Sequence, residues 1–180
     1  MTDESLISKW IETSGGPLVM MEKCKMTAWT GIGDTYPSPP GTVSHYDLAC
    51  GVDGYIGSIS IEGSQAVVLG DDPMQTSWMQ LCENDGIIIR WNFAESKEQV
   101  EKLVITMPLD QDWEKCGVIF EITTSELAIF DSAPRYEYLD DQLNFKLDAG
   151  KYEILNFRFE PIKDVSLILH RLLYLGGGID

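Results

Sequence analysis

The sequence predicts a mainly β protein, an α+β fold of compact antiparallel sheets with one or two short helices. Short runs rich in β-branched and aromatic residues recur along the chain, and glycine, proline, asparagine and aspartate separate them. Only one stretch shows a convincing helical period. With 180 residues, 44% of them hydrophobic, the chain can bury a substantial core. We therefore expect a single domain over residues 1–180.

The strands are predicted in chain order from their alternation and their boundaries. Residues 55–61, YIGSISI, alternate with a period of two, and the turn EGSQ leads from them into AVVL, which predicts a hairpin. Further runs read as strands of the same kind: GIIIRWNF (86–93), GVIFEIT (117–123), ELAIFDS (126–132), LNFKL (143–147), KYEILNFRF (151–159) and VSLILHRLLYL (165–175).

Helices are expected in two places. Residues 95–105 place apolar side chains at helical spacing, and Ser96 with Gln99 three positions later is close to a capping box. A second, weaker helix is predicted over residues 3–11. Residues 33–42, GDTYPSPPGT, contain three prolines and are predicted to form an exposed loop.

The two halves of the chain resemble each other. Residues 55–73 and residues 115–134 both read as a hairpin that ends in an acidic, proline-containing turn. A turn and a strand ending in Asn-Phe follow each of them. This similarity suggests an internal duplication and two similar β lobes, with sub-lobes at residues 1–108 and 109–180.

The charge is strongly acidic and unevenly placed. The formal net charge is −16, and no lysine or arginine occurs between Lys25 and Arg90. That interval contains eight acidic residues: Asp34, Asp47, Asp53, Glu62, Asp71, Asp72, Glu83 and Asp85. Such a segment repels nucleic acid and anionic membranes and attracts basic proteins. Improved solubility is the simpler interpretation of the same charge.

Patterns typical of catalysis or metal binding are missing from the sequence. It has no phosphate-binding glycine loop, no nucleophile elbow and no DxDxDG calcium loop. Asp71 and Asp72 are neighbours, so on a strand they would point to opposite faces and converge poorly on one substrate atom. The four cysteines form no CxxC pair and are expected to be free, buried thiols. We therefore expect no enzyme activity, no cofactor and no metal.

The N-terminus lacks the pattern of a secretory signal, and the apolar runs are too short to cross a bilayer. We therefore expect a cytoplasmic protein that does not insert into a membrane.

Several stretches in a fixed order carry a family resemblance. They are WIETSGGPLVMM, HYDLAC followed by GVDGYIGSI, AVVLGDDPMQTSW, IIIRW and, more weakly, FDSA. In this set the chain resembles the immunity protein 21 family of bacterial polymorphic toxin systems. It departs from the family pattern at Leu48, where a basic residue is usual, and at the additional Gly54. The resemblance implies a mostly β protein that binds and neutralises a cognate toxin domain without performing a reaction.

The acidic segment suggests how such binding would work. Toxins that attack nucleic acid are usually basic around their cleft, and an acidic surface would complement a nuclease-type toxin. Aromatic anchors are expected inside the acidic rim, with Tyr46, Tyr55 and Trp78 as candidates, although a tryptophan is more often a core residue. The predicted partner-binding residues are Asp47, Asp53, Tyr55, Asp71, Asp72, Trp78, Glu83 and Asp85. The alternative hypothesis is a β-rich protein that binds a small ligand or acts as an enzyme.

Overall fold

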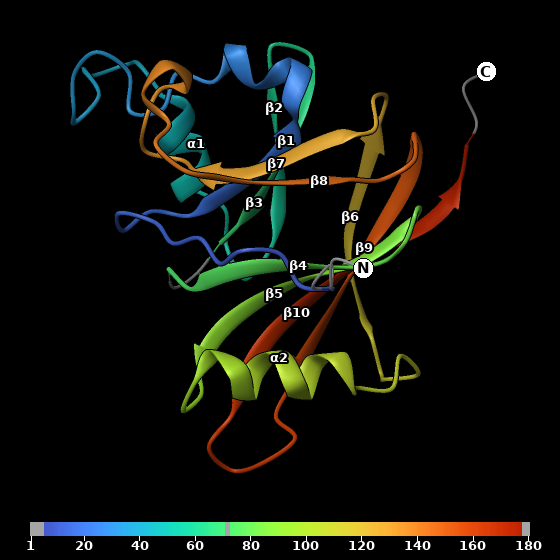
Figure 1. Cartoon of the computed structure of the whole chain (residues 1–180). Coiled ribbons are helices and arrows are strands. Elements are labelled where there is room, and N and C mark those ends of the chain that lie inside the picture. Colours follow the sequence, from blue (N-terminus) through green and yellow to red (C-terminus); the bar gives the residue numbers. More distant parts are fainter. Residues whose placement is uncertain (1–5, 71–72, 178–180) are drawn as a thin grey trace.

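The computed structural model describes residues 6–70 and 73–177, and in these residues ten strands form two five-stranded antiparallel sheets (Figure 1). The first sheet has the order β2-β3-β1-β7-β8, with β1 (Leu18–Glu22), β2 (Gly57–Ile61), β3 (Ser64–Leu69), β7 (Glu126–Asp131) and β8 (Gln142–Lys146). The second has the order β4-β5-β10-β9-β6, with β4 (Gln75–Cys82), β5 (Asp85–Phe93), β6 (Glu114–Ile122), β9 (Gly150–Phe159) and β10 (Ser166–Gly176). The prediction of a mainly β protein is confirmed.

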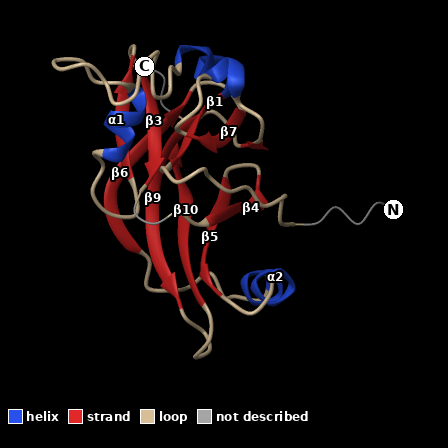
Figure 2. Cartoon of the chain, turned by 90° about the vertical axis from the view of Figure 1, so that its left-hand side faces the viewer, coloured by secondary structure: helices blue, strands red, loops and turns tan. Residues whose placement is uncertain are grey.

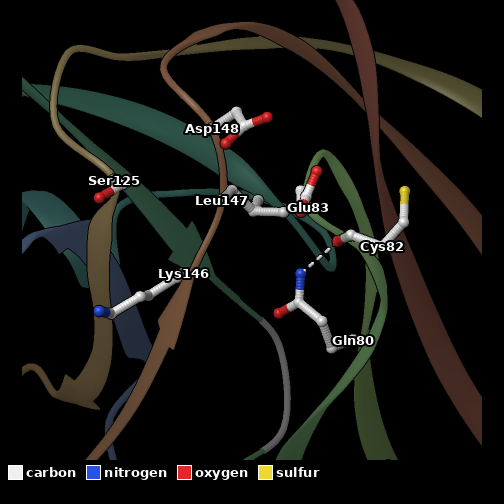
Figure 3. Close-up of a pocket in the computed structure, with 7 residues that line it drawn as sticks. All are labelled: Gln80, Cys82, Glu83, Ser125, Lys146, Leu147 and Asp148. Atoms are coloured by element: carbon white, nitrogen blue, oxygen red, sulfur yellow. Dashed lines mark hydrogen bonds between the residues drawn. The ribbon is translucent and has the colours of Figure 1, made fainter.

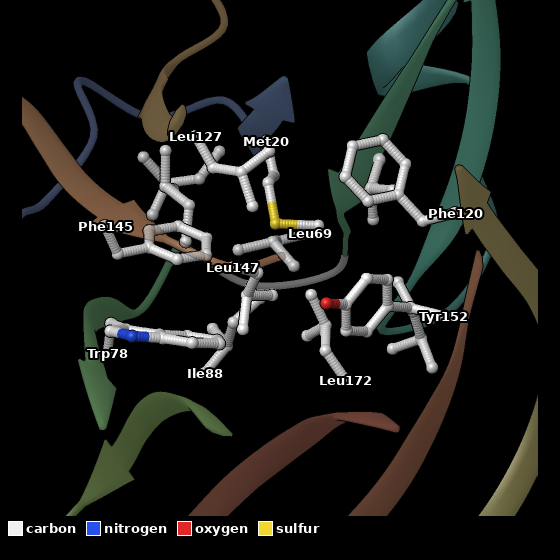
Figure 4. Packing of buried hydrophobic residues seen from close by; sticks show 14 of the residues in the cluster. Met20, Leu69, Trp78, Ile88, Phe120, Leu127, Phe145, Leu147, Tyr152 and Leu172 are labelled. Atoms are coloured by element: carbon white, nitrogen blue, oxygen red, sulfur yellow. The ribbon is translucent and has the colours of Figure 1, made fainter. Parts of the chain in front are cut away.

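The main core lies between the two sheets. Met20 and Leu69 of the first sheet face Ile88 and Trp78 of the second (Figure 4). The Trp78 ring stacks on Phe145 of β8 with the ring centroids 4.1 Å apart, which ties the two sheets together at one edge.

The second sheet is covered on its other face by α2 (Lys97–Ile105), as Figure 2 shows. Val100 and Val104 of this helix pack on apolar residues of β5 and β10. Burial on both faces explains the continuous apolar run of β5. The helix predicted over residues 95–105 is confirmed, and Ser96 caps it by accepting a hydrogen bond from the Gln99 amide.

The outer face of the first sheet is covered by three short helices, η1 (Lys23–Ala28), α1 (His45–Cys50) and η2 (Tyr136–Tyr138). Trp29, Ala49 and Phe130 belong to the apolar cluster on this face. Helix α1 was not predicted, because six residues are too few to show a helical period. Its signal is the capping box of Ser44 and Asp47.

Three predictions of local structure need correction. Residues 115–134 do not form a hairpin, because β6 pairs with β9 in the second sheet while β7 pairs with β1 and β8 in the first. No helix forms over residues 6–11, where Ile7 and Ile11 instead bridge to β4. The cysteines are free, but Cys24, Cys50 and Cys82 are exposed rather than buried.

Strands from before and after residue 108 occur in both sheets, so the two layers are not the two halves of the sequence. The expected loop at residues 33–42 contains no helix or strand and is largely exposed. None of the helices in the described part of the chain has the length and apolar character that a membrane-crossing helix needs.

Candidate functional site

Several of the stretches that carry the family resemblance meet at one end of the first sheet. Leu18 begins β1, and its partners on either side are Leu69, at the end of β3, and Asp131, at the end of β7. The GGP and DLAC stretches and Gly70 therefore converge where these three strands meet. Together they enclose a polar depression of about 340 Å³, which we call the motif pocket, lined by Gly15, Gly16, Pro17, Ala49, Cys50, Val52, Asp53 and Gly70.

Helix α1 packs against the GGP turn without room for a side chain. A Cβ atom on Gly16 would lie 2.5 Å from Cε2 of Tyr46, so only glycine permits this contact. Asp131 fixes the other side of the turn, accepting hydrogen bonds from the amides of Ser14 at 2.8 Å and Ala133 at 3.0 Å. These contacts indicate that the GGP and YDLAC stretches hold the fold together at this end.

The Tyr46 hydroxyl lies beside α1's last residue, Cys50. A hydrogen bond with the Cys50 thiol, together with burial and the nearby Asp131 carboxylate, raises the pKa of Tyr46 to about 12. Tyr46 is therefore neutral at physiological pH. Because it is half-buried between Gly16 and the residue 33–42 loop, it supports the pocket wall more than it offers a contact surface.

Arg90 lies inside the protein and holds the backbone beside the motif pocket. It is 1% exposed, and its guanidinium donates hydrogen bonds to the carbonyl oxygens of Tyr55 at 3.0 Å and Gly70 at 2.8 Å. In the sequence, Arg90 ends the segment without basic residues and belongs to the IIIRW stretch of the family resemblance, but its structural role was not predicted. The structure shows that its side chain is buried and not presented to solvent.

Asp47 caps helix α1. Its carboxylate accepts hydrogen bonds from the Ser38 hydroxyl and from the amide and hydroxyl of Ser44, at 2.9 Å and 2.8 Å for the latter two. The hydrogen bond from Ser38, followed by those from Ser44, lowers the pKa of Asp47. These bonds give Asp47 a structural role at the start of α1.

The other predicted residues near the motif pocket differ in their accessibility. Asp53 is exposed at the rim of the pocket. Tyr55 is half-buried, and its carbonyl accepts hydrogen bonds from Arg90 and the Gly70 amide. Asp71 and Asp72 lie outside the described residues.

Trp78 is a core residue. It is 2% exposed and stacked on Phe145, so its side chain is not available as a surface anchor. This corrects its assignment to the contact surface, and the core interpretation of this tryptophan is the one that holds.

Glu83 and Asp85 lie at the opposite end of β4 from the motif pocket. Strand β4 has eight residues and a strand of this length spans about 25 Å. Asp85 is engaged by Arg171 through two hydrogen bonds of 3.0 Å and 2.5 Å, whereas Glu83 is exposed. The predicted partner-binding residues therefore do not form one continuous surface.

The model of the family Immunity protein 21 matches residues 9–164. The chain belongs to this family. Membership confirms the resemblance seen in the sequence and indicates a toxin-neutralising role, with a toxin as partner and an inhibitor function in place of catalysis. No curated protein and no solved structure matches the chain.

A larger depression of about 580 Å³ lies beside Glu83 in this immunity protein (Figure 3). It is lined by Gln80, Cys82, Glu83, Ser125, Lys146, Leu147 and Asp148. Lys146 extends away from Glu83, and no histidine lines the wall. Its charged groups therefore do not converge on one point as a catalytic site requires. Across the described residues no group of three histidine, cysteine or acidic side chains is arranged to hold a metal ion.

Sequence reasoning also missed the aromatic residues that this family member does expose. The exposed tyrosines are Tyr36, Tyr136 and Tyr138, none of which was among the predicted anchors. The proline-rich composition around Tyr36 gave a signal of exposure, whereas nothing in the local sequence distinguishes Tyr138 from a core residue.

Proposed function

We propose that this immunity protein neutralises a basic, nuclease-type toxin domain through an acidic surface that extends from the motif pocket over the outer side of the first sheet. The surface, called the acidic end below, is formed by residues 30–62 and 131–141. These segments are joined by the hydrogen bond from the Ile32 amide to the Ala133 carbonyl, at 3.0 Å, and by the ion pair of Arg135 with Asp34, at 2.6 Å.

The observation that carries the proposal is the charge of this end. Its two segments contain eight acidic residues and one basic residue, Arg135. Arg135 is already paired with Asp34, and Lys9 approaches from outside the two segments to pair with Asp141. Asp53, Glu62 and Glu137 are exposed and belong to no ion pair among the described residues. The excess of negative charge is thus open to a partner.

A field of one sign favours a partner of the opposite sign. It accelerates association with a basic protein and orients the encounter, and it disfavours binding of nucleic acid itself. A domain that cleaves nucleic acid needs a basic cleft to hold its substrate. Occlusion of that cleft by the acidic end would exclude the substrate without any chemical step. We place this encounter in the cytoplasm, where the toxin would otherwise reach nucleic acid.

A small-ligand function is the second candidate, and the depression beside Glu83 is the observation that favours it. Its volume of about 580 Å³ falls within the range of ligand pockets. Purification of the protein with a bound metabolite, and no affinity for a toxin domain, would support this alternative.

The test uses the toxin domain encoded directly upstream of the gene for this chain, since an immunity gene is expected to follow its toxin gene. Affinity would be measured by calorimetry at low and moderate salt with an inactivated toxin domain. We expect binding that weakens as salt rises, and a loss of about tenfold or more in the double variant Asp53→Lys, Glu137→Lys.

The control is Asp110→Lys with Glu114→Lys, which changes the net charge equally, at exposed sites outside the acidic end. Absence of binding by the wild type, or equal losses in both double variants, would contradict the proposal.

A further inference from the structure

All three exposed tyrosines of the chain lie on the acidic end. Tyr36 is 63% exposed, Tyr138 is 70% exposed and Tyr136 is 38% exposed. Val43 and Leu48, which are also exposed, lie in the same segment of the chain. We call Tyr36, Val43, Leu48, Tyr136 and Tyr138 the tyrosine patch. Five exposed large hydrophobic side chains in the two segments of the acidic end make this region a candidate for an interaction surface.

The patch is built from two segments about one hundred residues apart in the sequence, and its parts are held in place. The Tyr136 amide donates to the Trp29 carbonyl at 3.1 Å, which fixes η2 next to the chain that enters the residue 33–42 loop. Within that loop, Tyr36 packs edge-on against Tyr46 with the centroids 5.9 Å apart. Figure 1 shows α1, η2 and this loop together at one side of the first sheet.

A notch of about 360 Å³ borders the patch at Val43. It runs between the loop and Arg135, and Asp34, Ser38 and Val43 are among the residues that line it. Its one acidic lining group, Asp34, is already paired with Arg135, which also lines the notch, so the notch offers shape and hydroxyl groups but no free acidic group.

We propose that the tyrosine patch is the anchoring surface on which the basic toxin domain docks. This proposal rests on the proposed function and adds the part of the surface that supplies affinity. Tyrosine offers a large contact area with few rotatable bonds, and binding energy at interfaces concentrates on such side chains inside a polar rim. Cations also bind favourably over the ring faces of tyrosine.

The charges on the patch identify its occupant as a basic partner rather than a second copy of this chain. Two copies docked through this surface would bring two acidic ends together, and like charges at an interface oppose association. A basic domain instead compensates the excess of acidic residues in the two segments of the acidic end, of which Asp53, Glu62 and Glu137 are exposed and in no ion pair among the described residues.

The test measures the affinity of the inactivated toxin domain encoded upstream for Tyr36→Ala, Tyr138→Ala and the double variant. We expect each single change to weaken binding about 10-fold to 30-fold. The matched controls are Phe93→Ala and Ile162→Ala, each 47% exposed in the wild type and located outside the acidic end. They should change the affinity less than about twofold.

Hydrogen exchange in the complex provides a second measurement that does not depend on variants. Amides of residues 33–43 and 136–139 should become protected when the toxin domain binds. Wild-type binding with no effect of the tyrosine changes and no protection at these residues would overturn the patch while leaving the proposed function in place. Absence of wild-type binding would overturn both.

Discussion

Glu22 offers a sharp test of how the two sheets are joined. This residue ends β1 in the first sheet, is 2% exposed, and accepts hydrogen bonds from the turn that links β6 to β7. The amide and hydroxyl of Thr123 donate at 2.7 Å and 2.8 Å, and those of Thr124 at 2.6 Å and 3.1 Å. Lys25 pairs with the other carboxylate oxygen. One carboxylate therefore fixes the point where the chain crosses between sheets.

The change Glu22→Gln keeps the shape of the side chain and removes its charge. Four charge-assisted hydrogen bonds become neutral ones, each weakened by about 0.5 kcal/mol where the donors are partly hydrated. We expect the free energy of unfolding to fall by about 2 kcal/mol and the melting temperature by about 4–8 °C in a domain of this size. The control Glu126→Gln removes only exposed ion pairs with Lys23 and Lys146 and should cost less than about 0.5 kcal/mol.

The pH dependence of this effect follows from the pKa of Glu22. Burial raises that pKa, but the bonds from Lys25, Thr123 and Thr124 outweigh burial and lower it below its usual value. A carboxyl group with a lowered folded pKa stabilises the protein above its unfolded pKa, about 4.3, and the stabilisation is lost as pH falls through the folded value.

Urea unfolding of the wild type and Glu22→Gln at pH 7 and at acidic pH would therefore show a difference that shrinks below about pH 4. A difference that is absent at pH 7, or constant over this range, would refute the reasoning.

Two further changes test the core and the acidic end. Trp78→Ala should lower the free energy of unfolding by about 3–5 kcal/mol, measured by urea titration, because it empties the contact with Phe145; a loss below about 1 kcal/mol would mean that Trp78 is not a core residue. Gly31→Ala should cost about 2–3 kcal/mol in the same measurement, because Gly31 has φ of +55° and a Cβ atom there would lie 2.3 Å from the Ala133 carbonyl oxygen. It should also weaken toxin binding by displacing the segment that carries Tyr138, and unchanged affinity would contradict the role given to this contact.

Local patterns in the sequence were enough to predict most of the strands and α2. Residues 55–61 alternate because one face of β2 is more buried than the other, and β5 is continuously apolar because both of its faces are buried. Ser96 is the N-cap of α2 and indicates where the helix begins. Strand β4 was missed because its sequence, QTSWMQLC, has no regular alternation and is half polar although its middle is buried.

Pairing between distant segments could not be read in this way. The β6–β7 segment has the sequence pattern of a hairpin. In the fold, however, β6 pairs with β9 and β7 pairs with β1, which places the two strands in different sheets. The same limit applies to the site. Asp53 and Glu83 lie within one acidic segment of the sequence but at opposite ends of β4, whereas Tyr36 and Tyr138 are distant in sequence and share one surface. Net charge led us to propose a basic partner, whereas the proposal of a contact surface needed the tertiary structure.

The central claim is most directly tested by the activity of the toxin itself. The purified chain would be titrated into the toxin domain encoded upstream while cleavage of nucleic acid is followed. If this protein neutralises the toxin, cleavage should fall in proportion to the added protein and stop at a one-to-one ratio. The Tyr36→Ala, Tyr138→Ala variant should require a large excess to stop cleavage. Full cleavage in the presence of excess wild-type protein would contradict the proposed neutralisation of the toxin.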